Sequence, residues 1–183
     1  MKAIDPSNPW KVNKKEKIYE NPWITLYHHD VITPGGNKGV YGMVDFKNLA
    51  IGVIPLDKEN NTWLVGQYRF PNEEYSWEIP AGGGALNEFP IKAAQRELIE
   101  ECGIIAKKWE HILEMRLSNS VSNEVAHIYM ARDLSFTSSQ PEDTEQLEIK
   151  KVPFKKALEL VMDGTIKDSM SVAGLLKVNA LLT

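Results

Sequence analysis

Short runs rich in β-branched and aromatic residues alternate with turn sequences over the first half of the chain. Glycine, proline, asparagine and aspartate gather at residues 34–37 and 57–61, a composition typical of turns. We expect strands on both sides of these turns and again further along the chain. The predicted strands are residues 23–32, 39–45, 49–55, 62–68, 75–79, 111–117 and 125–131.

Three other segments have the spacing of helices. The first begins near Pro90, because proline suits the first position of a helix, and it ends at Gly103. Two more are predicted at residues 153–162 and 168–182, with Gly164 ending the earlier one. Strands on both sides of a central helix, followed by terminal helices, favour a layered α/β or α+β domain, although periodicity leaves the strand order open.

A chain of 183 residues is long enough for one domain with a substantial core. Residues 1–20 are polar and contain Pro6, Pro9 and a lysine-rich cluster, so we expect an N-terminal arm there. Residues 21–183 are expected to form the domain.

Composition narrows the class of protein. A net charge of −4 gives no general attraction for nucleic acid. No apolar run is long enough to span a bilayer and the first residues lack a signal-peptide core, so we predict a cytoplasmic protein without a membrane partner. The single cysteine, Cys102, excludes an intramolecular disulfide and is expected to pack in the core.

Candidate chemistry is concentrated around the first predicted helix. Gly82, Gly83 and Gly84 precede it, and we expect a glycine-rich loop there, because glycines permit positive φ and let backbone come close to a ligand. Along the helix, three carboxylates share one face, at Glu97, Glu100 and Glu101. Like-charged pairs at this spacing cost a few tenths of a kcal/mol each, a repulsion that a divalent cation removes. Arg96 is expected to pair with Glu100.

The same segment resembles a known family signature. The run Gly82-x5-Glu88-x7-Arg96-Glu97-x2-Glu100-Glu101-x-Gly103, with aliphatic residues at 98 and 104, matches the consensus of the Nudix box. From about residue 23 to the end, the chain resembles a Nudix hydrolase. The resemblance implies an α/β/α sandwich around a mixed sheet, with residues 21–183 as the Nudix domain. It also implies hydrolysis of a nucleoside diphosphate linked to another moiety.

The resemblance further implies a Mg²⁺ site, with Mn²⁺ as a substitute. Glu97 and Glu101 would be direct ligands, the Ala81 carbonyl a neutral ligand, and Glu100 a further or alternate ligand. Arg96 would hold these carboxylates in place.

Residues just before the box indicate a branch of the family. The run Gln67-Tyr68-Arg69 followed by residues 77–82 resembles the corresponding segments of the enzymes that cleave ADP-ribose and other nucleoside diphosphate sugars. By this resemblance Arg69 contacts phosphate or ribose; the alternative is a surface ion pair with Glu73 or Glu74. Glu78 is either a substrate or metal contact, or a buried carboxylate that orients the glycine-rich segment.

Two segments after the box extend the resemblance. At residues 118–124 the branch usually carries Ser-Pro-Gly-x-Ser-x-Glu, but here Asn119-Ser120 replaces Pro-Gly, which widens the expected substrates to GDP-mannose. Glu124 matches, and is expected either beside the substrate or capping the next strand. In the acidic stretch that follows, Glu145 would complete the metal shell and Glu142 or Asp143 would activate water, with Glu100 as the next candidate. The alternative is a solvated acidic loop.

Base recognition is expected to use aromatic rings. Trp10, Tyr19, Trp23 and Tyr27 lie where relatives in this branch exchange segments across a homodimer and stack on the base, although core packing is the alternative for each tryptophan. The products would be a nucleoside monophosphate and a sugar phosphate.

Two other functions compete with this one. A Nudix enzyme acting on nucleoside triphosphates, dinucleoside polyphosphates, NADH or coenzyme A is disfavoured by the Gln-Tyr-Arg and acidic segments. A catalytically silent nucleotide sensor is disfavoured by the intact carboxylates.

Overall fold

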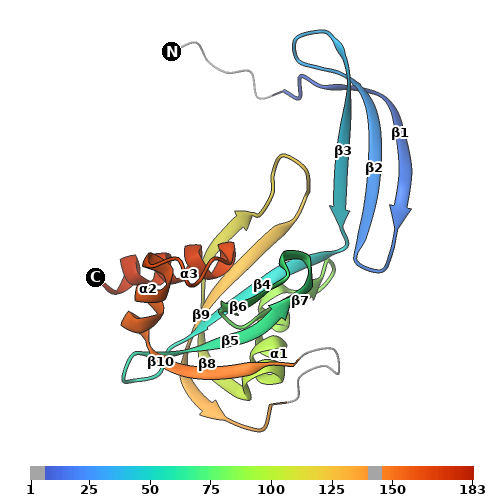
Figure 1. Cartoon of the computed structure of the whole chain (residues 1–183). Helices are drawn as coiled ribbons and strands as arrows, with labels where there is room; N and C mark the ends of the chain where they lie inside the picture. The colour runs from blue at the N-terminus through green and yellow to red at the C-terminus, as the bar shows by residue number, and fades with distance from the viewer. Residues whose placement is uncertain (1–6, 140–145) are drawn as a thin grey trace. The chain divides into compact units, whose positions relative to one another are not determined.

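The computed structural model describes residues 7–139 and 146–183. It divides into two compact units, of which the first contains residues up to Lys47 together with Ser118–Glu124 (Figure 1). The second contains Asn48–Leu117 and Val125–Thr183. Each unit is described by itself.

The first unit is an antiparallel sheet in the order β1-β2-β3, formed by Lys11–Glu20, Ile24–Ile32 and Lys38–Phe46 (Figure 1). Every residue of β1 is exposed. An exposed strand has no buried face to require apolar alternation, and its sequence shows none. Backbone pairing with β2 creates this strand. The short segment Ser118–Glu124 joins the unit through a parallel bridge between Val44 and Ser122.

The second unit contains one mixed sheet and one smaller antiparallel sheet. The mixed sheet has the order β7-β4-β9-β8, and its β4 and β9 run parallel; the strands are Ala81–Ala85, Asn48–Pro55, Val125–Phe136 and Ile104–Arg116. The smaller sheet has the order β10-β5-β6, formed by Glu148–Pro153, Asn61–Arg69 and Glu74–Glu78.

Helices cover both faces of the mixed sheet (Figure 1). Ile51 and Val53 of β4 pack in one core cluster with the apolar stripe of α1 (Pro90–Cys102). Ile54 belongs to the other cluster, with residues of α2 (Phe154–Met162) and α3 (Ser169–Leu182). Because successive strand residues point to opposite faces, this alternation places the sheet between two helical layers. The predicted α/β/α sandwich with a mixed sheet is confirmed.

The structure corrects the prediction that the glycine-rich segment is a loop. Gly82, Gly83 and Gly84 lie in strand β7, paired with β4, and none of them has a positive φ. Glycine is needed here for close approach instead. A Cβ atom at Gly82 would overlap the carboxylate of Glu97, and one at Gly84 would lie 3.0 Å from Cβ of Ala93.

Other boundaries depend on strand pairing. Helix α1 spans the predicted residues and ends at Gly103, whose φ is 62°. Strand β8 begins at Ile104, seven residues before the predicted start, because its first half pairs with the end of β9. Strand β10 was not predicted either; it forms by pairing with β5. No helix in the described ranges has both the length and the apolar character to cross a bilayer.

Candidate active site

Two buried carboxylates of α1 face strand β7. Glu101 retains 1% of its surface and Glu97 9%. The backbone N–H of Ala81 donates a hydrogen bond to Oε2 of Glu101, at 2.9 Å. A buried carboxylate is costly unless it is paired or hydrogen-bonded, and here Arg96 pairs with Glu97 while the Ala81 N–H binds Glu101. These carboxylates and the start of β7 form the centre of the candidate site.

Arg96 connects these groups. Its Nη1 lies 2.8 Å from Oε2 of Glu100 and 2.8 Å from Oε1 of Glu97. Its Nη2 donates to the carbonyl oxygen of Gly83, at 2.6 Å. The predicted pair with Glu100 is confirmed, and the structure adds the two other contacts. One guanidinium therefore holds two carboxylates of α1 against the backbone of β7.

Arg69 and Glu78 form a second ion pair at the ends of β5 and β6. Nε of Arg69 lies 2.9 Å from Oε1 of Glu78, and Nη2 lies 2.5 Å from Oε2. Glu78 is buried, whereas the side chain of Arg69 remains 39% exposed. The hydrogen bond that Arg69 donates to Glu78 raises the pKa of Arg69. The pairing considered with Glu73 or Glu74 is absent, and Glu74 instead binds Lys167 at 2.7 Å.

Two site residues at the start of α3, Ser171 and the capping residue Asp168, were missed by the sequence analysis. Ser171 is fully buried, accepts a hydrogen bond from the N–H of Ile79 at 2.9 Å, and donates to Oδ2 of Asp168 at 2.7 Å. The charges of Asp168 and Glu101 also raise the pKa of Arg69, which places both carboxylates near this guanidinium. The pattern Asp168-x-x-Ser171 could have indicated the start of α3. Nothing in it indicates the contact with Ile79.

The oxygen donors suit a hard divalent cation, and Gly82 leaves room for the Glu97 carboxylate beside β7. Among the described residues, however, no three acidic, histidine or cysteine side chains are grouped closely enough to hold a metal ion. Glu100 turns toward Arg96. Ala81 lies at the first position of β7, next to Glu101.

Four acidic residues beyond this group were also named in the sequence analysis. Glu142, Asp143 and Glu145 fall outside the described residues. Glu124 belongs to the first unit, where partial burial raises the pKa of its carboxyl group.

The Asn119-Ser120 substitution lies in a turn of the first unit. Ser118 accepts backbone hydrogen bonds from Val121 at 3.1 Å and Ser122 at 2.9 Å. The hydroxyl of Tyr41 donates to the carbonyl of Ser120 at 2.5 Å. These hydrogen bonds therefore hold the turn although it lacks the Pro-Gly pair.

The aromatic residues proposed for base stacking are on the first unit. Trp23 is 62% exposed, and Trp10 and Tyr19 are also exposed. Nζ of Lys15 lies 3.7 Å from the centre of the Tyr27 ring. Core packing within the described chain therefore does not account for Trp23, whereas the Trp10 ring packs edge-on against Tyr41, with ring centres 5.3 Å apart.

Comparison with known proteins agrees with these features. The sequence matches the nucleoside diphosphate sugar hydrolase N-terminal domain over residues 10–44 and the NUDIX domain over residues 46–170. It is 33% identical to an ADP-ribose pyrophosphatase of Bacillus subtilis (strain 168), over 92% of this chain and 90% of that protein. It is 24% identical to a GDP-mannose pyrophosphatase of Yersinia enterocolitica serotype O:8 / biotype 1B (strain NCTC 13174 / 8081), over 87% and 90% of the two chains.

A solved structure has the same fold. The crystal structure of an ADP compounds hydrolase superposes with a TM-score of 0.86, at 21% identity, over 98% of this chain and 97% of that chain. The box residues, the layered fold and the match over most of the sequence lead to one assignment. The chain belongs to the NUDIX domain family.

Proposed function

We propose that this protein hydrolyses the diphosphate bond of nucleoside diphosphate sugars, including ADP-ribose and GDP-mannose. The products are a nucleoside monophosphate and a sugar phosphate. The observation that carries the proposal is the pair of buried carboxylates, Glu97 and Glu101, held against β7 by Arg96 and the N–H of Ala81. The named activities of the Bacillus and Yersinia relatives support this substrate class.

Nudix hydrolases generally need a divalent metal ion, and for this chain we propose Mg²⁺, with Mn²⁺ as a substitute. The ion would be held by the carboxylates of Glu97, Glu100, Glu101 and Glu145 and by the carbonyl oxygen of Ala81. Such an ion neutralises diphosphate charge and lowers the pKa of bound water. Arg96 positions Glu97 and Glu100 for this role through the contacts already described.

Arg69 is proposed to bind a phosphate or ribose oxygen of the substrate. Its bonds to Glu78 use the Nε hydrogen and one Nη2 hydrogen, so three of the five guanidinium N–H donors remain for a ligand. Glu78 is then a positioning residue, because it fixes the plane of the guanidinium from its buried side. Glu124, the last residue of the segment 118–124, is proposed to contact the substrate.

The acidic segment is proposed to supply the base. If Glu142 or Asp143 activates the water, or Glu145 completes the metal shell, alanine at the responsible position lowers kcat much more than it raises KM. General-base catalysis contributes about a hundredfold to ten-thousandfold, which sets the expected loss. Steady-state kinetics of the three single alanine variants measures it. Normal kcat in all three would transfer the role to Glu100.

More than one nucleoside diphosphate sugar should be hydrolysed. Asn119 and Ser120 add hydrogen-bonding groups where proline would remove a donor, so the site can address different sugars or base edges. We expect ADP-ribose and GDP-mannose to be cleaved with kcat/KM values within a few orders of magnitude, since this ratio measures discrimination.

A screen of ADP-ribose, GDP-mannose, ADP-glucose, UDP-glucose and nucleoside triphosphates, with products identified by mass, tests this expectation. Cleavage of one nucleotide sugar alone would refute the broad specificity. Preference for triphosphates would overturn the substrate class, and binding without turnover would indicate a sensor. The homodimer, the cytoplasmic location and the absence of nucleic-acid and membrane partners stay predictions.

A further inference from the structure

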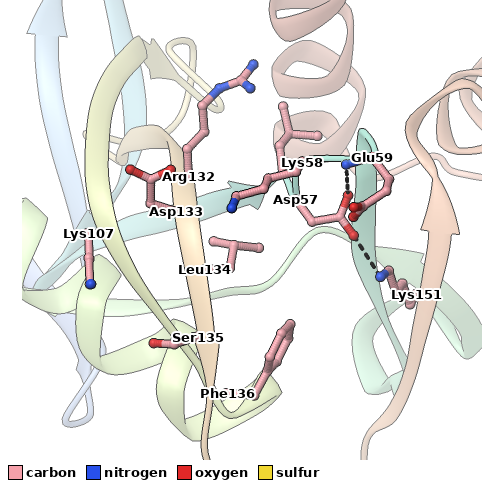
Figure 2. Close-up of a pocket in the computed structure, with 11 residues that line it drawn as sticks. Asp57, Lys58, Glu59, Lys107, Arg132, Asp133, Leu134, Ser135, Phe136 and Lys151 are labelled. Carbon is pink, nitrogen blue, oxygen red and sulfur yellow. Dashed lines mark hydrogen bonds and ion pairs between the residues drawn. The ribbon is translucent and has the colours of Figure 1, made fainter.

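The second unit contains a pocket whose described lining includes none of the carboxylates of α1. Its volume is about 660 Å³, within the range of about 300–1,000 Å³ typical of small-molecule sites. We call it the β9 pocket, because the end of β9 forms one side of it (Figure 2). The loop after β4, the start of β8 and strand β10 complete the lining.

Strand β5 separates this pocket from Arg69. Lys151, which lines the pocket, is paired in register with Trp63 near the start of β5. Arg69 ends the same strand, six residues beyond Trp63, which corresponds to roughly 20 Å at about 3.3 Å per residue. A ligand in the β9 pocket therefore lies away from Arg69, and the described lining contains no residue of α1.

Two carboxylates of the pocket already have cationic partners. Lys151 lies 2.7 Å from Asp57, and Lys108, just outside the lining, lies 2.9 Å from Asp133. Partial burial opposes ionisation of Asp57, but hydrogen bonds from Lys151 and Asn61 lower its pKa to about 2. Both carboxylates are thus ionised and paired at neutral pH.

Three further cations of the pocket lack such partners. Lys58, Lys107 and Arg132 form no ion pair or side-chain hydrogen bond with any residue in the ranges 7–139 and 146–183. The hydrogen bond from Lys108 lowers the pKa of Asp133, and the charges of Lys58 and Lys107 lower it further, so these lysines lie near the same carboxylate.

Glu59 is the one remaining carboxylate in the described lining. The described lining thus holds four cations and three carboxylates, an excess of one positive charge, and Lys108 beside it adds a second. This excess favours an anionic ligand. The whole chain carries a net charge of −4, so this local excess is not a general property of its surface.

An aromatic ring lies at the edge of the same pocket. Phe136 is 64% exposed, and its ring centre lies 5.7 Å from that of Trp63, which supports it from behind. Figure 2 shows Phe136 beside Ser135, on the same strand as Arg132 and Asp133. An exposed ring that is held from one side provides a stacking surface for a flat ligand ring.

We propose that the β9 pocket is a second nucleotide-binding site, with the phosphate among Lys58, Lys107 and Arg132 and the base on Phe136. Guanidinium and ammonium groups are the usual protein partners of phosphate oxygens. Stacking on one phenyl ring accepts any base, so the class is a nucleoside phosphate rather than a particular nucleotide. The site binds and breaks no bond, and this proposal is independent of the proposed hydrolysis.

A heteronuclear NMR titration of the full chain in EDTA tests the proposal, with AMP, inorganic phosphate and adenosine as separate probes. We expect saturable shifts of the Asp133 and Ser135 amide signals with AMP, a weaker response with phosphate, and the weakest with adenosine. Signals from β7 report any binding at the proposed substrate site. The double variant Lys58→Gln/Lys107→Gln should weaken AMP binding about tenfold or more, because it removes two charged phosphate contacts.

A control double variant distinguishes the loss of two positive charges in general from their loss inside the pocket. Lys38→Gln/Lys177→Gln removes the same charge from two exposed lysines outside the pocket, and AMP binding there should stay unchanged. Phe136→Ala should weaken AMP binding while leaving the phosphate response as it was.

Three results would overturn the proposal. The first is the absence of saturable shifts at Asp133 and Ser135, and the second is equal AMP affinity in the two double variants. The third is equal binding of phosphate and AMP with no effect of Phe136→Ala, which would reduce the pocket to a plain anion-binding surface.

Discussion

Glutamine at position 97 or 101 is expected to lower kcat/KM by about a hundredfold or more while the protein stays folded. An amide has the shape of the carboxylate but supplies no charge to a hard cation. Its oxygen can still accept the hydrogen bond from the Ala81 N–H that Glu101 now accepts. Steady-state kinetics over a Mg²⁺ titration measures the loss, and circular dichroism measures folding.

Glu110→Gln provides the matched control, since Glu110 is exposed on β8 and outside the candidate site. Its kinetics should equal those of the unchanged protein. EDTA should abolish activity in both, with recovery on addition of Mg²⁺ or Mn²⁺. Normal rates for both Glu97→Gln and Glu101→Gln at limiting metal would remove these residues from the metal site.

Gly82→Ala is expected to lower kcat/KM by at least about tenfold, because displacing a catalytic group by about 1 Å can cost a hundredfold. The new Cβ atom would occupy the place of the Glu97 carboxylate and force it away from β7. No unusual backbone angle contributes, since Gly82 has no positive φ. Kinetics and thermal unfolding of the variant measure the two effects separately.

Gly83→Ala is the control on the neighbouring residue. A Cβ atom at Gly83 meets only the side-chain nitrogen of Asn48, at 3.3 Å, and that side chain can move. Both substitutions make the same change to backbone freedom, so only the contact with Glu97 differs. An equal loss in both variants, or none in either, would show that the close approach of β7 to Glu97 does not matter for turnover.

Local sequence signals determined the features that depend on neighbours along the chain. Pro90 and Gly103 delimit helix α1 because one suits the start of a helix and the other adopts the left-handed conformation at its end. The pairing of Arg96 with Glu100 follows from one turn of helical spacing. The glycine and carboxylate spacing of the box also identified the family and, through it, the layered fold.

Partners distant in sequence were decided only by the tertiary structure. Gly82 is in a strand because β4 pairs with it. The β5–β6 register places Glu74 opposite Arg69, yet the Arg69 side chain extends along the sheet to the buried Glu78. Ser171 reaches Ile79 across 92 residues. Periodicity reports which face of an element is apolar, but it contains no information about which element lies opposite. Those contacts come from packing the sheets and helices together, and they give the candidate site its geometry.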